Sequence, residues 1–165
     1  MREPVEHDAC ELLDADHLAV KHLFVEYARL AYGGDTPAAD GRAAIALRIC
    51  DELTVHAQIE EEIFYPALRD ALPATADVVA EAEDEHAQAK ALIAEIRGLG
   101  TPGDLMDQRV ADLARVVEDH VKEERDELFP KARGNPGLDL RELGLALRAR
   151  QQALEQEQGR NAAPA

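Results

Sequence analysis

Residues 55–66 read VHAQIEEEIFYP and residues 119–130 read DHVKEERDELFP, so one pattern occurs twice in the chain. In each copy a histidine is followed by a glutamate after four residues and by a proline after ten. Four residues advance an α-helix by about 400°, which places each histidine and its glutamate on the same face. Apolar residues recur at helical spacing along this face, so it should point into the core. A carboxylate or imidazole there must be paired, neutralised or bound to a metal, because leaving it bare costs several kcal/mol.

The duplication extends upstream of both stretches. An acidic residue and a histidine, followed four residues later by a lysine, occur over residues 16–21 and again over 85–90. Each half of the chain therefore predicts an acid-His helix followed by a His-x-x-x-Glu helix. Two matched helix pairs predict an all-α four-helix bundle with a pseudo-twofold axis. Six side chains would converge inside it: His17, His56, Glu60, His86, His120 and Glu124.

Composition and charge limit the possible folds and partners. The chain has 165 residues, which fits one domain, and its low aromatic content of 4% and lack of Trp favour helix over sheet. A net charge of −16 argues against nucleic acid or an anionic membrane as partner. No apolar run reaches the ~20 residues that a bilayer-spanning helix needs. Cys10 and Cys50 form no C-x-x-C pair and no secretory signal is recognisable, so we expect reduced thiols and a cytoplasmic protein.

The spacing of apolar residues predicts the helix boundaries. It places bundle helices at about residues 8–32, 41–71, 75–99 and 105–132, and Pro66 should bend or end the second one. Leucines at 140, 143, 147 and 154 predict a shorter amphipathic helix across the bundle. We expect a single domain over residues 1–158 and a disordered tail over 159–165.

The six converging side chains suit a pair of metal ions. Imidazole and carboxylate are ligands for iron, manganese or zinc and suit Cu(I) poorly. Two histidines for each metal, with shared glutamate oxygens, would leave open coordination positions, which distinguish a reactive site from a closed structural one. The duplication favours a pairing by halves with both glutamates as bridges: His17 with His56, His86 with His120, and Glu60 and Glu124 between them. Asp16 and Glu85 are the nearest acids that could orient a histidine, although adjacent helix residues point about 100° apart, which leaves their role open.

On these residues the sequence resembles the hemerythrin-like HHE cation-binding family. The resemblance is carried by DH at 16–17, HAQIEEEIFYP at 56–66, EHAQAKALI at 85–93 and HVKEERDELFP at 120–130, and it covers nearly all of residues 8–133. It implies an up-and-down antiparallel bundle around two non-haem iron ions that are bridged by carboxylates and by an oxo or hydroxo group. By motif match the four histidines become terminal ligands and the two glutamates become bridges.

Two departures from the oxygen-carrying members of that family affect the expected ligand. Those members have a second histidine four residues after the third-helix histidine, where this sequence has Lys90, which we expect to extend to the surface. They also place an aspartate, at slightly longer spacing, where this sequence has Glu124. Both differences weaken the case for reversible O₂ carriage and leave NO binding, peroxide turnover, or sensing of iron or oxygen at least as open.

Other polar and aromatic residues receive less specific expectations. Glu61 could be an additional ligand or part of a solvated face, and His7 and His22 should lie at the surface. Tyr65 is expected to be a packing residue, and Phe64 and Phe129 should close one end of the bundle and keep the metal pocket dry.

Three functions therefore remain open. The first is a non-haem di-iron protein that binds or senses O₂, NO, peroxide, or iron and redox state, with manganese or zinc as alternative metals. The second is a di-iron enzyme with catalase-like or peroxidase-like activity. The third is a metal-free helical interaction module, and the sequence does not predict the oligomeric state.

Overall fold

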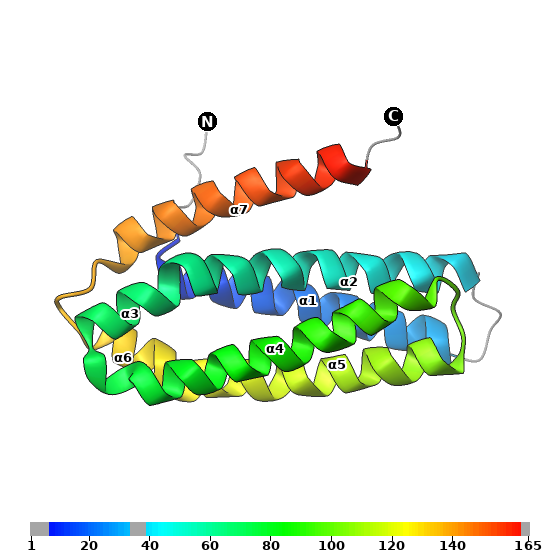
Figure 1. Ribbon diagram of the computed structural model, residues 1–165, viewed down its shortest axis with the longest axis horizontal. Helices are drawn as coiled ribbons and strands as arrows, with labels where there is room; N and C mark the ends of the chain where they lie inside the picture. Colours follow the sequence, from blue (N-terminus) through cyan, green and yellow to red (C-terminus); the bar gives the residue numbers. More distant parts are fainter. Residues whose placement is uncertain (1–6, 34–38, 163–165) are drawn as a thin grey trace.

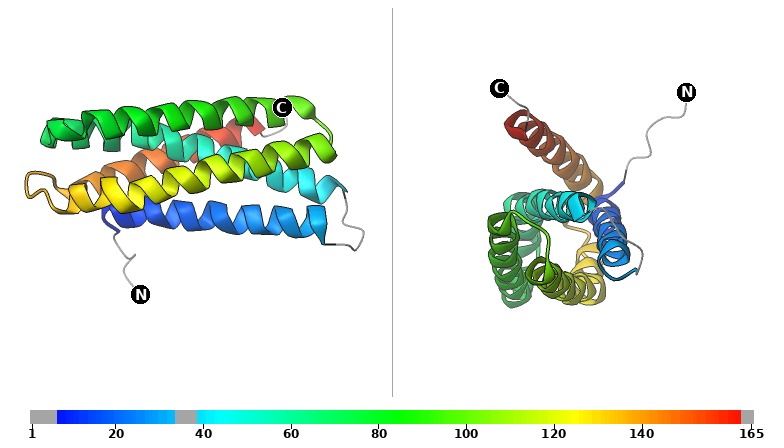
Figure 2. Two further views of the ribbon diagram at one scale, coloured as in Figure 1. Left: turned by 90° about the horizontal axis from the view of Figure 1, so that it is seen from below. Right: turned by 90° about the vertical axis from the view of Figure 1, so that its right-hand side faces the viewer.

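The computed structural model describes residues 7–33 and 39–162, and every element within these ranges is helical. The bundle helices, in chain order, are α1 (Ala9–Tyr32), α2 (Ala39–Ile59), α4 (Ala76–Leu99) and α5 (Asp104–Glu123) (Figure 1). Each bundle helix contacts the next one along the chain, and α1 also contacts α5, so the four form a closed up-and-down ring (Figure 2). The predicted four-helix bundle with an additional C-terminal helix is confirmed. Within the described residues no helix is both long and apolar enough to cross a bilayer.

Two of the bundle helices continue through a π-helical turn. Helix α2 passes through η1 (Glu60–Phe64) into α3 (Tyr65–Ala71), and α5 passes through η3 (Glu124–Leu128) into α6 (Phe129–Arg133). The short 3₁₀ turn η2 (Pro73–Thr75) then leads from α3 into α4.

The π turns explain how the helices accommodate the two prolines. The Tyr65 N–H donates to the Glu60 carbonyl, five residues back, and Phe129 does the same to Glu124. A proline in an α-helix lacks an N–H donor and crowds the carbonyl four residues before it. The wider turn ahead of Pro66 places this proline in the first turn of α3, where a missing donor costs little, so the helix is neither ended nor sharply broken.

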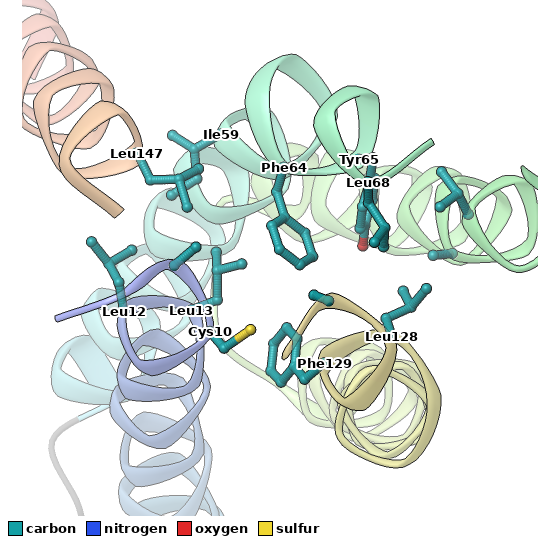
Figure 3. Close-up of a cluster of buried hydrophobic side chains, with 14 of the residues drawn as sticks. Cys10, Leu12, Leu13, Ile59, Phe64, Tyr65, Leu68, Leu128, Phe129 and Leu147 are labelled. Carbon is teal, nitrogen blue, oxygen red and sulfur yellow. The ribbon is translucent and has the colours of Figure 1, made fainter. Parts of the chain in front are cut away.

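The apolar core is divided into two clusters along the bundle. One cluster, shown in Figure 3, gathers Phe64 and Phe129 with side chains from α1, α3 and α7 at the end where the π turns lie. The two phenyl rings are edge-to-face at 5.9 Å and almost fully buried, so they close this end as expected. The other cluster fills the opposite half of the bundle around Ile49 and Leu113. The six residues singled out above lie between the two clusters along each helix.

The C-terminal helix differs from the prediction. Helix α7 (Leu140–Ala162) has 23 residues, almost as many as the 24 of α1, and it lies along the outside of α1 and α2 instead of being a short crossing segment (Figure 1). Its Leu147 and Leu154 are buried, and the Gln158 amide donates to the Asp51 carbonyl at 3.1 Å. These contacts hold the helix against the bundle as far as residue 158. Residues 159–162 are therefore helical and not part of a disordered tail, while 163–165 lie outside the described residues.

Candidate metal centre

The structure brings all six predicted site residues together from the four bundle helices. The two glutamates are fully buried, and the four histidines are between 4% and 6% exposed. Each glutamate is the first residue of a π turn, and its histidine lies one turn earlier on the same helix.

The histidines are paired by halves, as the duplication predicts. The Nε2 atoms of His17 and His56 lie 3.1 Å apart, and those of His86 and His120 are also 3.1 Å apart. Two nitrogen atoms at this distance can both ligate one metal at about 2.0–2.1 Å. Each pair therefore defines one candidate metal position.

Each buried carboxylate reaches both histidine pairs. Glu60 Oε1 lies 2.9 Å from His56 Nε2 and 3.3 Å from His86 Nε2. Glu124 Oε1 lies 2.6 Å from His120 Nε2 and 3.4 Å from His17 Nε2. The carboxylates are therefore placed between the two candidate positions, where a bridging ligand has to lie.

The hydrogen bonding of these carboxylates is incomplete without a metal. None of the four oxygens of Glu60 and Glu124 has a hydrogen bond of acceptable geometry, although imidazole nitrogens are close. A buried carboxylate without aligned donors is costly, and a cation bound by this set of nitrogen and oxygen atoms would satisfy it.

The charges of the cluster are strongly coupled. Burial alone would lower the pKa of His56, but the carboxylates of Glu60 and Asp16 outweigh it and raise this pKa to about 10. The pKa values of His86 and His120 are raised in the same way, against burial, by the glutamates next to them. Burial would also raise the pKa of Glu60, but its imidazole neighbours hold it well below the ordinary value. Without a metal, the cluster therefore favours the protonated imidazoles of His56, His86 and His120 beside an ionised Glu60.

Comparison with known proteins agrees with this donor set. The family model "Hemerythrin HHE cation binding domain" matches residues 8–132. The chain belongs to this family. Membership implies a metal cofactor, and the convergent His/Glu cluster is where this HHE domain could hold it.

A solved structure and a curated relative are also similar to this HHE domain. The crystal structure of a hemerythrin HHE cation binding domain-containing protein from Mycobacterium kansasii has a TM-score of 0.72, covers 92% of this chain and 89% of that one, and is 25% identical. A protein described as a DNA nickase, from Nostoc sp., is 35% identical over 88 residues, which are 53% of this chain and 24% of that protein. The chain thus spans about a quarter of the length of that relative.

The outer nitrogen of every site histidine in this HHE domain faces a carboxylate. The contacts from Nδ1 are His17 to Asp14 at 3.4 Å, His56 to Asp16 at 3.1 Å, His86 to Glu61 at 3.7 Å and His120 to Glu85 at 3.2 Å. A carboxylate that is hydrogen-bonded to Nδ1 orients the ring and leaves Nε2 free to ligate a metal. This holds for His17, His56 and His120, whereas Glu61 faces His86 Nδ1 at ion-pair distance without a hydrogen bond. The acid that precedes a histidine in the sequence, Asp16 or Glu85, thus serves the histidine of the neighbouring helix.

Glu61 and Lys90 lie behind the site and not in it. The Lys90 ammonium donates to both oxygens of Glu61 at 2.7 and 2.9 Å, and the lysine is exposed, as expected. Glu61 therefore backs His86 instead of offering an additional ligand. In the other half the position after Glu124 is Arg125, whose Nε donates to Asp14 at 2.7 Å. Each half thus has an ion pair of a carboxylate and a cation next to Nδ1 of one histidine. The residue after the buried glutamate is the acid of this pair in one half, Glu61, and the cation in the other, Arg125.

Tyr65 is a site residue that the sequence analysis assigned to packing. Its side chain is fully buried, and its hydroxyl lies 3.3 Å from Nε2 of both His86 and His120. Phe129 takes the equivalent position in the other half, and its ring stacks on that of His17 at 6.0 Å. The two halves therefore differ by one hydroxyl. Comparing the residue before each proline, tyrosine in one copy and phenylalanine in the other, could have drawn attention to it.

A small cavity adjoins the histidines on the side away from the two phenyl rings. Its volume is about 30 Å³, which is room for about two water-sized molecules. Apart from the site residues, it is lined mainly by aliphatic side chains: Val20, Leu53, Ile93 and Val117. A diatomic molecule or a peroxide fits this space better than a larger organic substrate does.

Proposed function

We propose that this chain holds two iron ions between its four bundle helices and uses them to bind or sense a small molecule such as O₂, NO or peroxide. The observation that carries the proposal is that each of two buried carboxylates reaches an imidazole nitrogen of both halves. Bound iron would supply open coordination positions for the small molecule. Manganese or zinc could be held by the same atoms.

The protein's own residues would prepare this site in three ways. The Nδ1 carboxylates hold the imidazoles with Nε2 pointing inward. Glu60 and Glu124 supply negative charge between the two metal positions. The aliphatic walls of the cavity limit the access of bulk water, which favours a small apolar or weakly polar ligand over hydroxide.

Peroxide turnover is the second candidate, and the position of Tyr65 favours it. Its hydroxyl is a hydrogen-bond donor among the buried imidazoles and carboxylates of the site, beside one histidine pair and on the side of the two phenyl rings. Burial, with the negative charges of Glu124 and Glu60, raises the pKa of this phenol well above its ordinary value, so the metal-free protein keeps it protonated. It could therefore orient a peroxide or become an additional metal ligand.

The Tyr65→Phe variant should separate these roles, because it makes the two halves alike. We expect it to retain two metals per chain, since the four histidines and two glutamates remain. If the hydroxyl serves turnover, peroxide consumption should fall at least about tenfold, as expected for loss of a positioned acid–base group. Stopped-flow absorption and peroxide assays on wild type and variant at equal iron content measure this, and unchanged rates would exclude the role.

Two other readings have weaker support. A metal-free interaction module would leave four buried carboxylate oxygens without suitable donors. The similarity to the Nostoc DNA nickase covers only part of that protein, and a net charge of −16 argues against binding to DNA. The cysteines Cys10 and Cys50 are free and lie in different core clusters, which agrees with the cytoplasmic location that we propose.

The proposed function is tested by iron content and absorption. After anaerobic loading with Fe(II) and exposure to air, we expect about two irons per chain and a visible band that changes when azide is added, or when NO is added to the reduced protein. His17→Ala should lose iron, whereas His22→Ala, an exposed histidine on the same helix, should not. A colourless protein without bound iron after this treatment would reject the proposal.

A further inference from the structure

Helix α7 lies beyond the residues that the family model matches, yet it reaches the metal centre. The Gln151 amide donates to both carboxylate oxygens of Asp16, at 3.0 and 2.9 Å. Asp16 in turn accepts from Nδ1 of His56 at 3.1 Å. A chain of hydrogen bonds thus runs from α7 through α1 to a candidate ligand on α2.

We propose that Gln151 is a positioning residue of the metal centre, so that α7 helps to retain the metal held by His17 and His56. This inference rests on the proposed function. Gln151 holds Asp16 in the orientation in which its carboxylate accepts a hydrogen bond from Nδ1 of His56. This hydrogen bond fixes the ring with Nε2 pointing inward.

Three further contacts fix α7 where Gln151 can act. Arg150 donates through Nε to Glu62 at 2.8 Å, and Glu62 lies in the π turn that begins with the bridging Glu60. Leu147 is fully buried against the bundle. Gly144 packs on the start of α1 so closely that an added Cβ would lie 2.5 Å from the His7 carbonyl oxygen. The helix cannot slide along the bundle without breaking these contacts.

Among the residues that the structure describes, none gives the other half of the site the equivalent support. Glu85, which corresponds to Asp16, has the carboxyl group of Glu123 beside it instead of an amide donor. A change in α7 should therefore affect the His17/His56 position and leave the His86/His120 position almost unaltered. This selectivity is the signature that separates positioning from a general loss of stability.

Water can reach the contact between Gln151 and Asp16. A cavity of about 230 Å³ lies between α1, α2 and α7, and both residues line it. If Gln151 is replaced, water can hydrogen-bond to Asp16 but cannot hold it in one orientation. We therefore expect faster release of one metal and not the complete loss of binding.

The experiment measures metal release from the full chain loaded anaerobically with Fe(II), after a ferrous chelator is added in excess. Wild type is compared with Gln151→Leu, which removes the donor but keeps most of the volume, with Asp16→Asn, and with Gln152→Ala as an exposed control on the same helix. We expect one of the two irons to leave about tenfold faster in Asp16→Asn, the lower end of the effect of orienting groups, and at least about threefold faster in Gln151→Leu. The double variant should resemble Asp16→Asn alone, because both changes act through one contact.

A Gly144→Ala variant tests the same inference by moving α7, and Gln151 with it, away from α1 without changing the Gln151 side chain, and it should show the same selective release. Thermal melts of each variant check that the bundle is folded. If wild type binds two irons and Gln151→Leu releases both at the wild-type rate, the role of Gln151 is overturned and the proposed function stands. If both irons leave equally faster, the effect is a general loss of stability, and the role is also overturned. A wild-type chain that binds no iron overturns both.

Discussion

Replacing Glu60 with glutamine should abolish tight binding of the metal pair while the bundle still folds. The substitution keeps the size of the side chain but removes the negative charge from a fully buried position between the two histidine pairs. A glutamine offers a neutral carbonyl to one metal and cannot bridge two cations in the way that a carboxylate can. Groups that only orient metal ligands already contribute 10- to 100-fold in affinity, so we expect a loss of more than about 100-fold here.

The duplication supplies matched controls for this prediction. Glu124→Gln should give a loss of similar size, since Glu124 lies at the equivalent position and also contacts both histidine pairs. Glu127→Gln, in the same π turn but with its side chain 53% exposed, should retain the metals. Metal content after gel filtration, with circular dichroism to confirm folding, measures all three variants. Two tightly bound metals in Glu60→Gln would show that this carboxylate is not a bridge.

The sequence predicted the main parts of the site because the motif that carries the site residues occurs twice in the chain. Each copy of the pattern was ambiguous alone, since a histidine and a glutamate at helical spacing also occur in ordinary cores. Two copies with the same spacing predicted a bundle with a pseudo-twofold axis. This symmetry in turn predicted which histidines should lie next to each other. The structure accordingly pairs His17 with His56 and His86 with His120, with the glutamates between them. Their function as metal ligands stays a prediction until iron is measured.

The features that the sequence did not reveal depend on where helices lie relative to each other. The carboxylates that face Nδ1 of His56, His86 and His120 were hidden because each lies on a different helical segment from its histidine, as Asp16 does for His56. The length of α7 was underestimated because its support comes from contacts with α1 and α2 and not from its own pattern. Tyr65 was assigned to packing because a single tyrosine beside apolar residues carries no periodic signal. Tyr65 also directly follows a π turn, whose extra residue departs from the regular helical spacing that the sequence analysis assumed.

Removal of the metals should lower the melting temperature, and the difference should grow with pH. A metal present at about 1,000 times its dissociation constant stabilises the folded state by about 4 kcal/mol. For a chain of this size each kcal/mol corresponds to roughly 2–4 °C, so the difference near neutral pH should be about 10 °C. Paired thermal melts with and without a chelator, at pH values between about 6 and 9, measure this difference.

The dependence on pH follows from the histidine pKa values in the metal-free protein. The pKa of His56 is raised from 6.5 to about 10, so its contribution to stability is fully present below pH 6.5 and is lost as the pH rises towards 10. His86 and His120 shift in the same direction. A metal binds only the neutral imidazoles and must displace these protons, so its affinity rises with pH. As the pH rises, the metal-free protein therefore becomes less stable to unfolding over the same range in which bound metal stabilises the protein more.

Competition between protons and metals also predicts metal release in acid, and the Glu60→Gln variant serves as the control. Below pH 6 protons compete more strongly for the imidazoles, and towards pH 4 also for the carboxylates, so the metals should be released and the difference between the two melts should close. The Glu60→Gln chain, which lacks one of the two buried carboxylates, should respond little to the chelator at any pH in this range. A wild-type difference that stays constant or shrinks as the pH rises, or full metal content at pH 4, would mean that protons and metals do not compete for these histidines. The ligands would then have to lie elsewhere in the chain.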